Sequence, residues 1–385
     1  MFESVVIYFT SFLISVFAAK QYQLLKNSSN GNGVKISYND IYRIIWASFS
    51  IGIPVLLATL RSESVGTDYR AYNSIFSATK MINPLEYANL HFFIDPITYR
   101  LEIGFHTIGY ISYSICDSTL FYSFLCELII MIFIWKGAEF YSSYYNFSFP
   151  QLLFFFYLLD YLHGYSVVRF SMIVAIFFWA FQYVIKKEFL KYFFCLLLAM
   201  TIHKTAIICL FFYLFNIIEL RPVKFYAVII VPVIMGGFLY SLGDILLYVR
   251  GFEFLEYANE YSAQTNDNKI FSAVITSMLF LLPMVYYYRR LMMLNRSYML
   301  LLMVGLMYLP FNWLGYYNFF FTRMGRLPEL IICVLICILF NSLKKNITLD
   351  FWKLYYYGYI VALHFSIFFI HNDISNLYPY SFISV

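Results

Sequence analysis

The sequence has few charged residues. Of its 385 residues only 12% are Asp, Glu, Lys or Arg, whereas 62% are hydrophobic; soluble domains carry about 25% charged residues. The mean hydropathy is +0.71. This composition excludes a soluble protein of several domains, a disordered chain and a coiled coil. It indicates an integral protein of the lipid bilayer.

The sequence also lacks motifs for nucleotides and metals. It has no P-loop, no Rossmann glycine pattern, no His-Glu-x-x-His and no paired Cys-x-x-Cys. ATP-driven transport and zinc chemistry therefore have no support, and we expect no metal and no cofactor. The net charge of +5 is thinly spread, so we expect no nucleic-acid partner. The six cysteines are scattered, mostly within apolar runs, and are interpreted as free core residues.

Apolar runs long enough to cross a bilayer recur along the chain. The clearest are 4–19, 43–60, 119–135, 149–163, 170–185, 222–242, 270–288, 297–314, 327–341 and 354–370. No small-residue cleavage site follows the first run, which predicts a retained helix rather than a signal peptide. Segment 102–116 is short, and segment 192–218 is interrupted by a polar pair. We predict an all-α polytopic membrane protein of about 10–12 transmembrane helices, with broken or re-entrant segments, in a single domain over residues 1–385.

The distribution of Lys and Arg orients the chain. With the N-terminus outside, 102–116 dipping in from outside and 192–218 forming a broken hairpin entered from inside, 16 of the 26 Lys and Arg lie inside. If both segments crossed once, each side would hold 13. The first arrangement places three substantial loops outside, and we expect them to form the active face. These loops are 61–101, 243–269 and 315–326.

Arginine dominates the cations placed outside. The seven outer arginines are Arg61, Arg70, Arg100, Arg169, Arg250, Arg323 and Arg326. A guanidinium group binds phosphate or carboxylate through two parallel hydrogen bonds, whereas Lys acts as a point charge. Outer acidic residues are the alternative partners. We favour a phosphate-facing role for at least two of these arginines.

A polar turn follows the second apolar run. Arg61 closes that helix, Gly66 permits a tight turn, and Asp68 can cap a helix that is expected from Tyr69 onward. On physical grounds alone, the favoured interpretation is a loop at the membrane exit, followed by a helix with an ordinary N-cap. An Arg and an Asp so close to one membrane end could also form a binding site at the bilayer surface.

Two further charged positions interrupt apolar helices. Arg169 near a helix start costs at least about 2.5 kcal/mol on insertion scales, so it faces a cavity or a partner unless it snorkels to the interface. His203 and Lys204 divide two arms that are each too short to span the membrane. A broken helix whose polar break faces a cavity is a recurrent binding-site device, and histidine can act as base or donor near neutral pH.

Other charged residues complete the candidates. Arg323 and Arg326 share one helix face if that segment is helical, which suits a diphosphate. Glu102 is a candidate base or a partner for an arginine. Glu127 and Asp160 are expected to be packing residues or members of structural pairs.

Taken in order, these residues resemble the EpsG/Wzy kind of integral membrane polysaccharide polymerase. The pattern has an Arg, then Val-Gly-Thr-Asp-Tyr and a Tyr three further on, then Glu-x-Gly-Phe, an Arg that opens a helix, and His-Lys-Thr-Ala. The corresponding residues are Arg61, Val65 to Tyr69, Tyr72, Glu102 to Phe105, Arg169 and His203 to Ala206. The order and spacing of these residues agree with the family pattern from about residue 43 to 218. Phe170 and Arg326 depart from the pattern, which usually has Gln and an aromatic residue there.

The resemblance implies a GT-C-like glycosyltransferase of the bacterial inner (cytoplasmic) membrane with a periplasmic active face. Such an enzyme moves the growing glycan from undecaprenyl diphosphate to the non-reducing end of a new undecaprenyl-diphosphate-linked repeat unit of O-antigen, capsule or exopolysaccharide. It implies no metal, no nucleotide sugar and a chain-length regulator protein as partner. The implied catalytic residues are His203, Asp68, Arg169 and Glu102, with His203 the better base. The implied diphosphate or glycan contacts are Arg61, Arg169, Arg323, Arg326, Tyr69, Tyr72 and Lys204.

Other functions stay open at this point. An O-antigen ligase shares the lipid diphosphate and the arginines but delivers glycan to lipid A core. A flippase or transporter would hold its cations in a central cavity and tend to show two similar halves, and no repeat is visible here. A membrane acyltransferase would gather charge on the side of its acyl donor. A purely structural subunit would not need the interruptions at Arg169 and His203.

Overall fold

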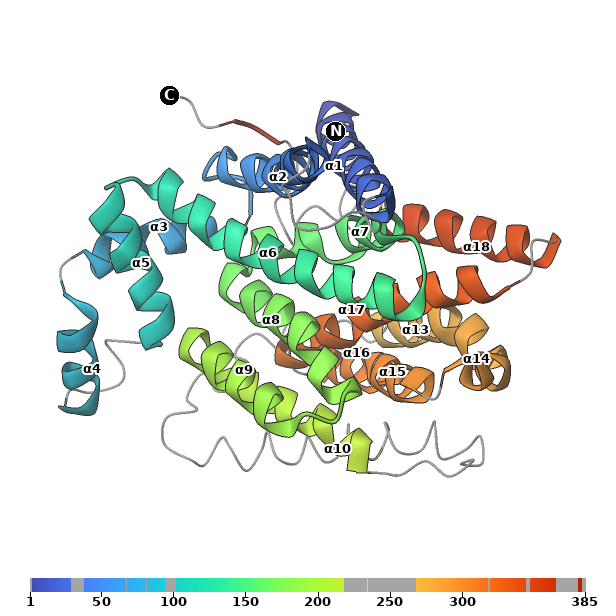
Figure 1. Cartoon of the computed structure of the whole chain (residues 1–385). Helices are drawn as coiled ribbons and strands as arrows, with labels where there is room; N and C mark the ends of the chain where they lie inside the picture. The colour runs from blue at the N-terminus through green and yellow to red at the C-terminus, as the bar shows by residue number, and fades with distance from the viewer. Residues whose placement is uncertain are drawn as a thin grey trace. The chain divides into compact units, whose positions relative to one another are not determined.

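The structure is a computed structural model, and its described residues are helical wherever they form regular elements. The described residues are 2–28, 38–66, 68–80, 82–93, 102–217, 234, 268–295, 297–317, 319–343, 347–364 and 380–382. Within them, an isolated β-bridge joins Arg61 to Phe382. The predicted all-α polytopic membrane protein is confirmed (Figure 1). Run 222–242 apart from residue 234, loop 243–269 apart from residues 268 and 269, and Arg100 and Arg250 lie outside the described residues.

Six helical segments are long and apolar enough to cross a membrane. They are α1 (Phe2–Ser28), α2 (Tyr38–Thr59), α6 (Thr119–Tyr145), α8 (Val168–Ile185), the consecutive helices α15 (Ser297–Leu306) and α16 (Tyr308–Tyr317), and α17 (Phe319–Ser342). Each of the six coincides with a predicted apolar run. Hydropathy alone therefore predicted the positions of these six long helical segments.

Other apolar helices are shorter than the predicted spans. Run 149–163 forms α7 (Phe149–Leu159) and a 3-10 helix, η1 (Tyr161–Tyr165). The 11 residues of α7 rise about 16 Å, roughly half of the hydrocarbon core. The remaining short elements are α9 (Phe189–Ile202), η2 (Lys204–Leu210), α10 (Phe211–Ile217) and α14 (Tyr288–Leu294). Two longer helices are α13 (Asn268–Tyr286) and α18 (Ile347–His364).

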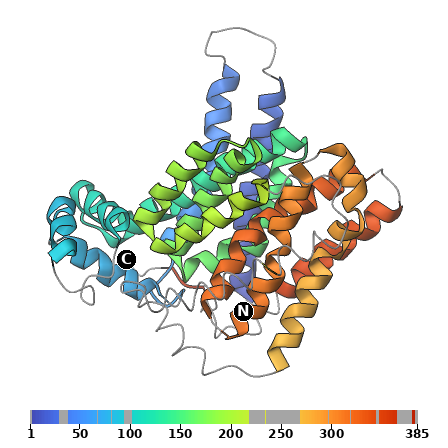
Figure 2. The ribbon, with the colours of Figure 1, turned by 90° about the horizontal axis from the view of Figure 1, so that it is seen from below.

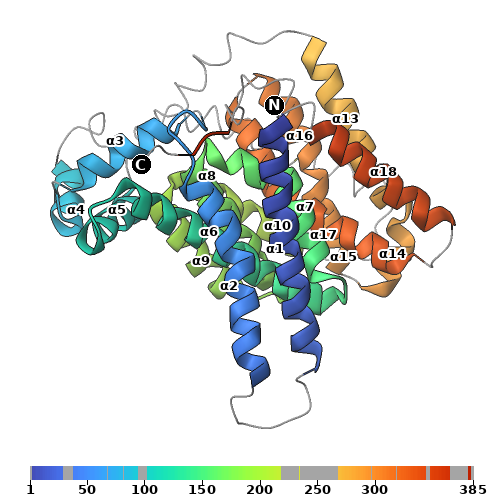
Figure 3. The same cartoon turned by 90° about the horizontal axis from the view of Figure 1, so that it is seen from above.

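Internal contacts divide the chain into two compact units. The first unit comprises 1–182, 193–207 and 357–385, and the second comprises 183–192 and 208–356. In the first, α1 and α2 lie side by side, α2 packs on α6, and α1 packs on α7 (Figure 3). In the second, α17 packs on α15 and α16, and α16 packs on α13. The single domain over the whole chain stays a prediction.

Three short helices form a group within the first unit. They are α3 (Tyr69–Thr79), α4 (Pro84–Phe93) and α5 (Ile103–Ile115). Both α3 and α4 pack on α5, and α5 packs on α6 (Figure 2). This group carries two of the predicted site motifs into contact with the long helices.

A proline inside α2 creates a polar contact among three helices. Because Pro54 has no N–H, the carbonyl of Ser50 loses its helical donor. The hydroxyl of Ser15 in α1 donates to that carbonyl at 2.6 Å, and Ser15 Oγ lies 2.7 Å from the Tyr157 hydroxyl of α7. Since an unpaired backbone group is costly in lipid, this contact ties α1, α2 and α7 together.

The structure confirms the predicted break at His203 and Lys204. α9 ends at Ile202, and His203 itself is not helical. Beyond the break, the ring of Tyr213 in α10 lies 4.9 Å from the ring of Phe189 at the start of α9. The chain therefore doubles back, as expected for a broken hairpin.

The contact around Pro54 yields a non-additive pair of substitutions. We expect Ser15→Ala to lower the free energy of unfolding by about 1–3 kcal/mol, because the Ser50 carbonyl loses its closer donor and keeps only the Tyr157 hydroxyl at 3.5 Å. In a Pro54→Ala background Ser15→Ala should cost much less, because the introduced alanine supplies the missing N–H. Unfolding in mixed detergent micelles measures both. Ser114→Ala, which removes an exposed hydroxyl bonded within its own helix, is the control, and equal costs in the two backgrounds would contradict the explanation.

Candidate functional site

Glu102, Arg169 and the break at His203–Lys204 meet in the first unit. Glu102 is the N-cap residue of α5, and Arg169 lies in the first turn of α8. Glu102 Oε2 accepts a hydrogen bond from Arg169 Nη1 at 3.1 Å, and Oε1 accepts one from the backbone N–H of Lys204 at 3.0 Å. His203 Nδ1 lies 3.7 Å from the same Oε1. One carboxylate thus joins three predicted site residues from distant parts of the sequence; these four residues are called the Glu102 cluster.

The Glu102 cluster is partly open to solvent. The side chains of Arg169, His203 and Glu102 are 23%, 18% and 11% exposed. Beneath the guanidinium, the fully buried ring of Phe105 has its centroid 5.6 Å from Arg169 Cζ. Among the described residues, Arg169 makes one hydrogen bond, to Glu102. Because a guanidinium has five N–H donors, Arg169 keeps donors for a ligand.

Local backbone geometry holds the cluster together. The N–H of Lys204 opens a new helical turn and has no helical acceptor, so the Glu102 carboxylate satisfies it. His203 Nδ1 lies 3.1 Å from Thr205 Oγ1, which fixes the plane of the ring. Gly104 brings α5 against α9, since a Cβ there would overlap the Thr201 side chain. The Glu-x-Gly-Phe motif therefore supplies a charge, a close helix contact and an apolar floor.

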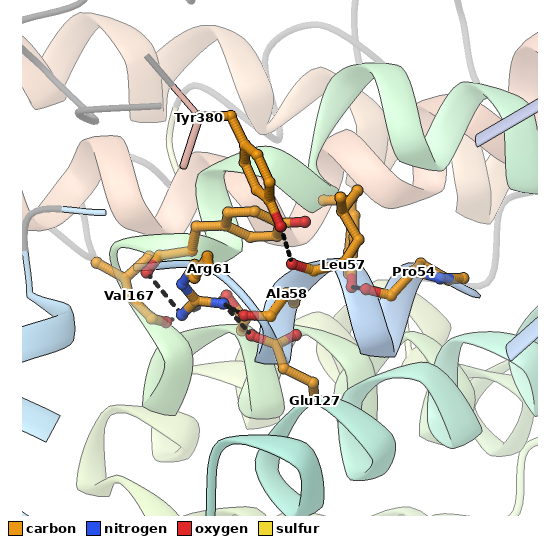
Figure 4. A network of polar contacts seen from close by, with 10 residues as sticks. Pro54, Leu57, Ala58, Arg61, Glu127, Val167 and Tyr380 are labelled. Carbon is orange, nitrogen blue, oxygen red and sulfur yellow. Dashed lines mark hydrogen bonds and ion pairs between the residues drawn. The ribbon is translucent and has the colours of Figure 1, made fainter. Parts of the chain in front are cut away.

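Arg61 lies in a closed setting, without the openness predicted for it. Its side chain is fully buried and pairs with Glu127 of α6 at 3.3 Å. Nη1 also donates to the Ala58 carbonyl at 2.6 Å (Figure 4). Nη2 donates to the Tyr165 carbonyl at 3.3 Å. The Tyr69 and Tyr165 rings cover the group, 4.4 and 4.6 Å from Cζ. The predicted diphosphate contact of Arg61 does not fit this placement, whereas Glu127 is a structural pair member, as expected.

The end of α2 next to Arg61 is held by a segment from much later in the chain. The Tyr380 hydroxyl donates to the Leu57 carbonyl at 2.7 Å (Figure 4). The backbone N–H of Ser62 donates to the Ser381 carbonyl at 2.8 Å. Terminal carbonyls of a helix have no helical donor, so Arg61 and Tyr380 between them cap this end of α2.

The turn between Arg61 and α3 depends on Gly66. Gly66 has a φ of +94°, and a Cβ on it would lie 2.6 Å from the Tyr165 carbonyl oxygen. Sequence reasoning predicted the turn but missed its partner Tyr165, because nothing in the sequence signals a close approach between two backbones. The helix after the turn begins at Tyr69, as predicted. Asp68 occupies its N-cap position, but the Asp68 side chain makes no capping hydrogen bond.

The remaining residues predicted to contact the substrate are two tyrosines and two arginines. Tyr69 and Tyr72 are 3% and 9% exposed, and Tyr72 packs on Phe105 with ring centroids 6.0 Å apart. These two rings support the charged residues from inside the protein. Arg323 and Arg326 both lie in α17, within the second unit, and Arg326 is 5% exposed. Their contact with a diphosphate stays a prediction.

Comparison with known proteins gives one match. The sequence model of the EpsG family matches residues 44–382. This span contains the Glu102 cluster, the turn at Gly66 and the arginines of α17. No curated protein and no solved structure matches the chain; GT-C-like architecture stays a prediction.

Replacement of Gly66 tests the turn. We expect Gly66→Ala to lower the free energy of unfolding by about 1–3 kcal/mol, because alanine is strained at positive φ and its Cβ meets the Tyr165 carbonyl. Gly52→Ala is the matched control, since a Cβ at Gly52 meets nothing within 4 Å and helical Ala is favoured by about 0.5–1 kcal/mol. Detergent unfolding of both variants measures the contrast. Two equal shifts would contradict the proposed constraint.

Proposed function

The chain belongs to the EpsG family of polysaccharide-polymerase-like membrane proteins, and we propose that it polymerises lipid-linked oligosaccharide repeat units. The growing glycan leaves its undecaprenyl diphosphate and joins the non-reducing end of a new undecaprenyl-diphosphate-linked unit of O-antigen, capsule or exopolysaccharide. The observation that best supports this reaction is the carboxylate of Glu102, which holds Arg169 beside His203 at a helix break.

The proposed reaction requires a stabilised leaving group. The acceptor hydroxyl oxygen bonds to the anomeric carbon of the growing glycan, the bond from that carbon to the diphosphate oxygen breaks, and the diphosphate departs as an anion. In our proposal the remaining N–H donors of Arg169 bind this anion. Glu102 fixes the guanidinium plane beforehand, and fixed donors in a site of low polarity stabilise developing charge strongly.

The reaction also requires a base for the acceptor proton. We assign this role to His203, whose ring is 18% exposed and lies at ion-pair distance from Glu102. When the imidazole takes the proton, Glu102 stabilises the cation that forms. Asp68, half-buried at the start of α3, is the second candidate base. No metal or other cofactor takes part in the proposed mechanism.

The proposed setting is the bacterial inner membrane with the Glu102 cluster on the periplasmic face. Its substrates are undecaprenyl-diphosphate-linked oligosaccharides, and its proposed partner is a chain-length regulator. The multi-pass helices support a location in the bilayer. The alternative functions, O-antigen ligase and lipid-linked oligosaccharide flippase, are separated from polymerase by the products that accumulate in variants.

Replacement of Arg169 tests the polymerase assignment. We expect Arg169→Ala to lower polymerisation by about 10²–10³-fold, because the leaving diphosphate loses its fixed donors. Arg169→Lys should restore little, since Lys cannot reproduce the planar fork. Surface glycan from the native host, resolved on a gel, should collapse to a single repeat unit on its carrier or core.

The matched control is Arg70→Ala, which removes an arginine of outer loop 61–101 whose side chain is 79% exposed. It should leave glycan length unchanged. Immunoblots establish equal membrane levels of all variants. Unchanged glycan length in Arg169→Ala would contradict the proposed role of Arg169. If the single repeat unit were lost as well, a flippase or a ligase would be favoured.

Cysteine labelling tests the proposed sidedness. Among the described cysteines Cys116 is the exposed one, so Cys116→Ser provides the background. In spheroplasts, a membrane-impermeant maleimide should label Glu63→Cys, which lies in the turn before α3, without permeabilisation. Lys187→Cys, in the exposed turn after α8, should be labelled after permeabilisation only. The reverse pattern would place the Glu102 cluster on the cytoplasmic face.

A further inference from the structure

A groove lies between the C-terminal turns of α6 and α8, away from the Glu102 cluster. Its volume is about 450 Å³. Lys136, Glu139, Ser143, Tyr144, Trp179 and Gln182 line it. α8 rises about 20 Å between Arg169 and Gln182, so the groove lies at the other end of that helix. The proposed polymerase reaction does not use it.

One lysine and one glutamate line the groove, and Lys26, which lies outside the groove, pairs with that glutamate, so the three charges sum to one positive. Its acid, Glu139, is already engaged, because Lys26 Nζ and the Tyr22 hydroxyl donate to Glu139 Oε1 at 2.7 and 2.6 Å. The Lys136 side chain is exposed and, among the described residues, forms no hydrogen bond or ion pair, although its charge interacts with that of Glu139. Lys136 therefore presents an ammonium group with donors to spare to the groove.

The position of the groove along α6 matches the edge of a bilayer. Lys136 stands about 26 Å along the helix from Thr119 at 1.5 Å per residue, and the hydrocarbon core is about 30 Å thick. Tyr144 and Trp179, which belong to the side chains enriched at membrane interfaces, line the same groove. Their rings pack on Phe140 and Phe133, with centroids 5.3 Å apart in each pair. Ammonium and amphipathic rings thus stand together at headgroup level.

We propose that this groove binds the phosphodiester headgroup of an anionic phospholipid. Lys136 pairs with the phosphate, Ser143 and Gln182 offer polar contacts, and Tyr144 and Trp179 border the glycerol. Basic pockets between transmembrane helices are a recognised mode of anionic headgroup binding.

Lipid titration of the purified full chain tests this proposal. In neutral detergent, phosphatidylglycerol should raise the unfolding temperature more than phosphatidylcholine does. Lys136→Gln should weaken phosphatidylglycerol binding about fivefold, which corresponds to about 1 kcal/mol per lysine near an anionic surface, while Lys136→Arg should retain it. Lys20→Gln, which neutralises an exposed lysine of α1 outside the groove, should bind like the unaltered chain.

Two further measurements separate a lipid from a free phosphate. Glycerol phosphate without acyl chains should stabilise the protein far less than phosphatidylglycerol; equal stabilisation would overturn the lipid assignment. Glu139→Gln should tighten phosphatidylglycerol binding, because it removes the negative charge that faces the headgroup. Equal effects of the two phospholipids, or unchanged binding in Lys136→Gln, would overturn the site itself. Unfolding temperatures without lipid show whether each variant folds.

Discussion

The buried charge of Arg61 is the constraint on which the first unit depends. A guanidinium removed from water needs a charge partner and hydrogen bonds. The partners of Arg61 come from four places, and among the described residues only its Nε has no hydrogen-bond partner. Glu127 comes from α6, the Ala58 carbonyl from the end of α2, the Tyr165 carbonyl from η1, and the Tyr69 ring from α3. Satisfying one cation thus fixes the positions of four elements, and Gly66 completes the turn that joins two of them.

The Glu102 cluster follows the same rule with a different outcome. Arg169 also meets a carboxylate, yet 23% of its side chain stays exposed, against 0% for Arg61. In the buried pair, the arginine donates its hydrogen bonds to groups of the protein itself. In the partly exposed pair, the arginine keeps N–H donors that can bind a ligand. Exposure, rather than residue type, therefore separates the structural arginine from the candidate functional one. The groove at Lys136 follows the same rule: Lys26 and Tyr22 donate hydrogen bonds to its glutamate, whereas Lys136 forms no hydrogen bond or ion pair among the described residues.

Sequence alone predicted those features that depend on local pattern. Hydropathy located the six long helices, and the polar pair His203–Lys204 located the break, because each is encoded by neighbouring residues. The burial of Arg61 depends on Glu127, 66 residues away, and its neighbours in a polar turn indicate the opposite, a surface position. Likewise, α7 reads as a full span, although η1 ends it after 11 residues. Long-range pairings decide such cases, and a local pattern does not encode them.

The contact between Ser62 and Ser381 orders events during synthesis. The two side-chain oxygens are 2.6 Å apart and the residues are 319 positions apart in sequence. A ribosome feeding helices into the bilayer completes α1 and α2 long before residue 380 emerges. Until then the carbonyl of Leu57 lacks the Tyr380 hydroxyl and the polar turn lacks its last backbone partner. The turn after α2 therefore acquires its last hydrogen-bond partners only after residues 380 and 381 have been synthesised, when the helices on either side of the turn are already complete.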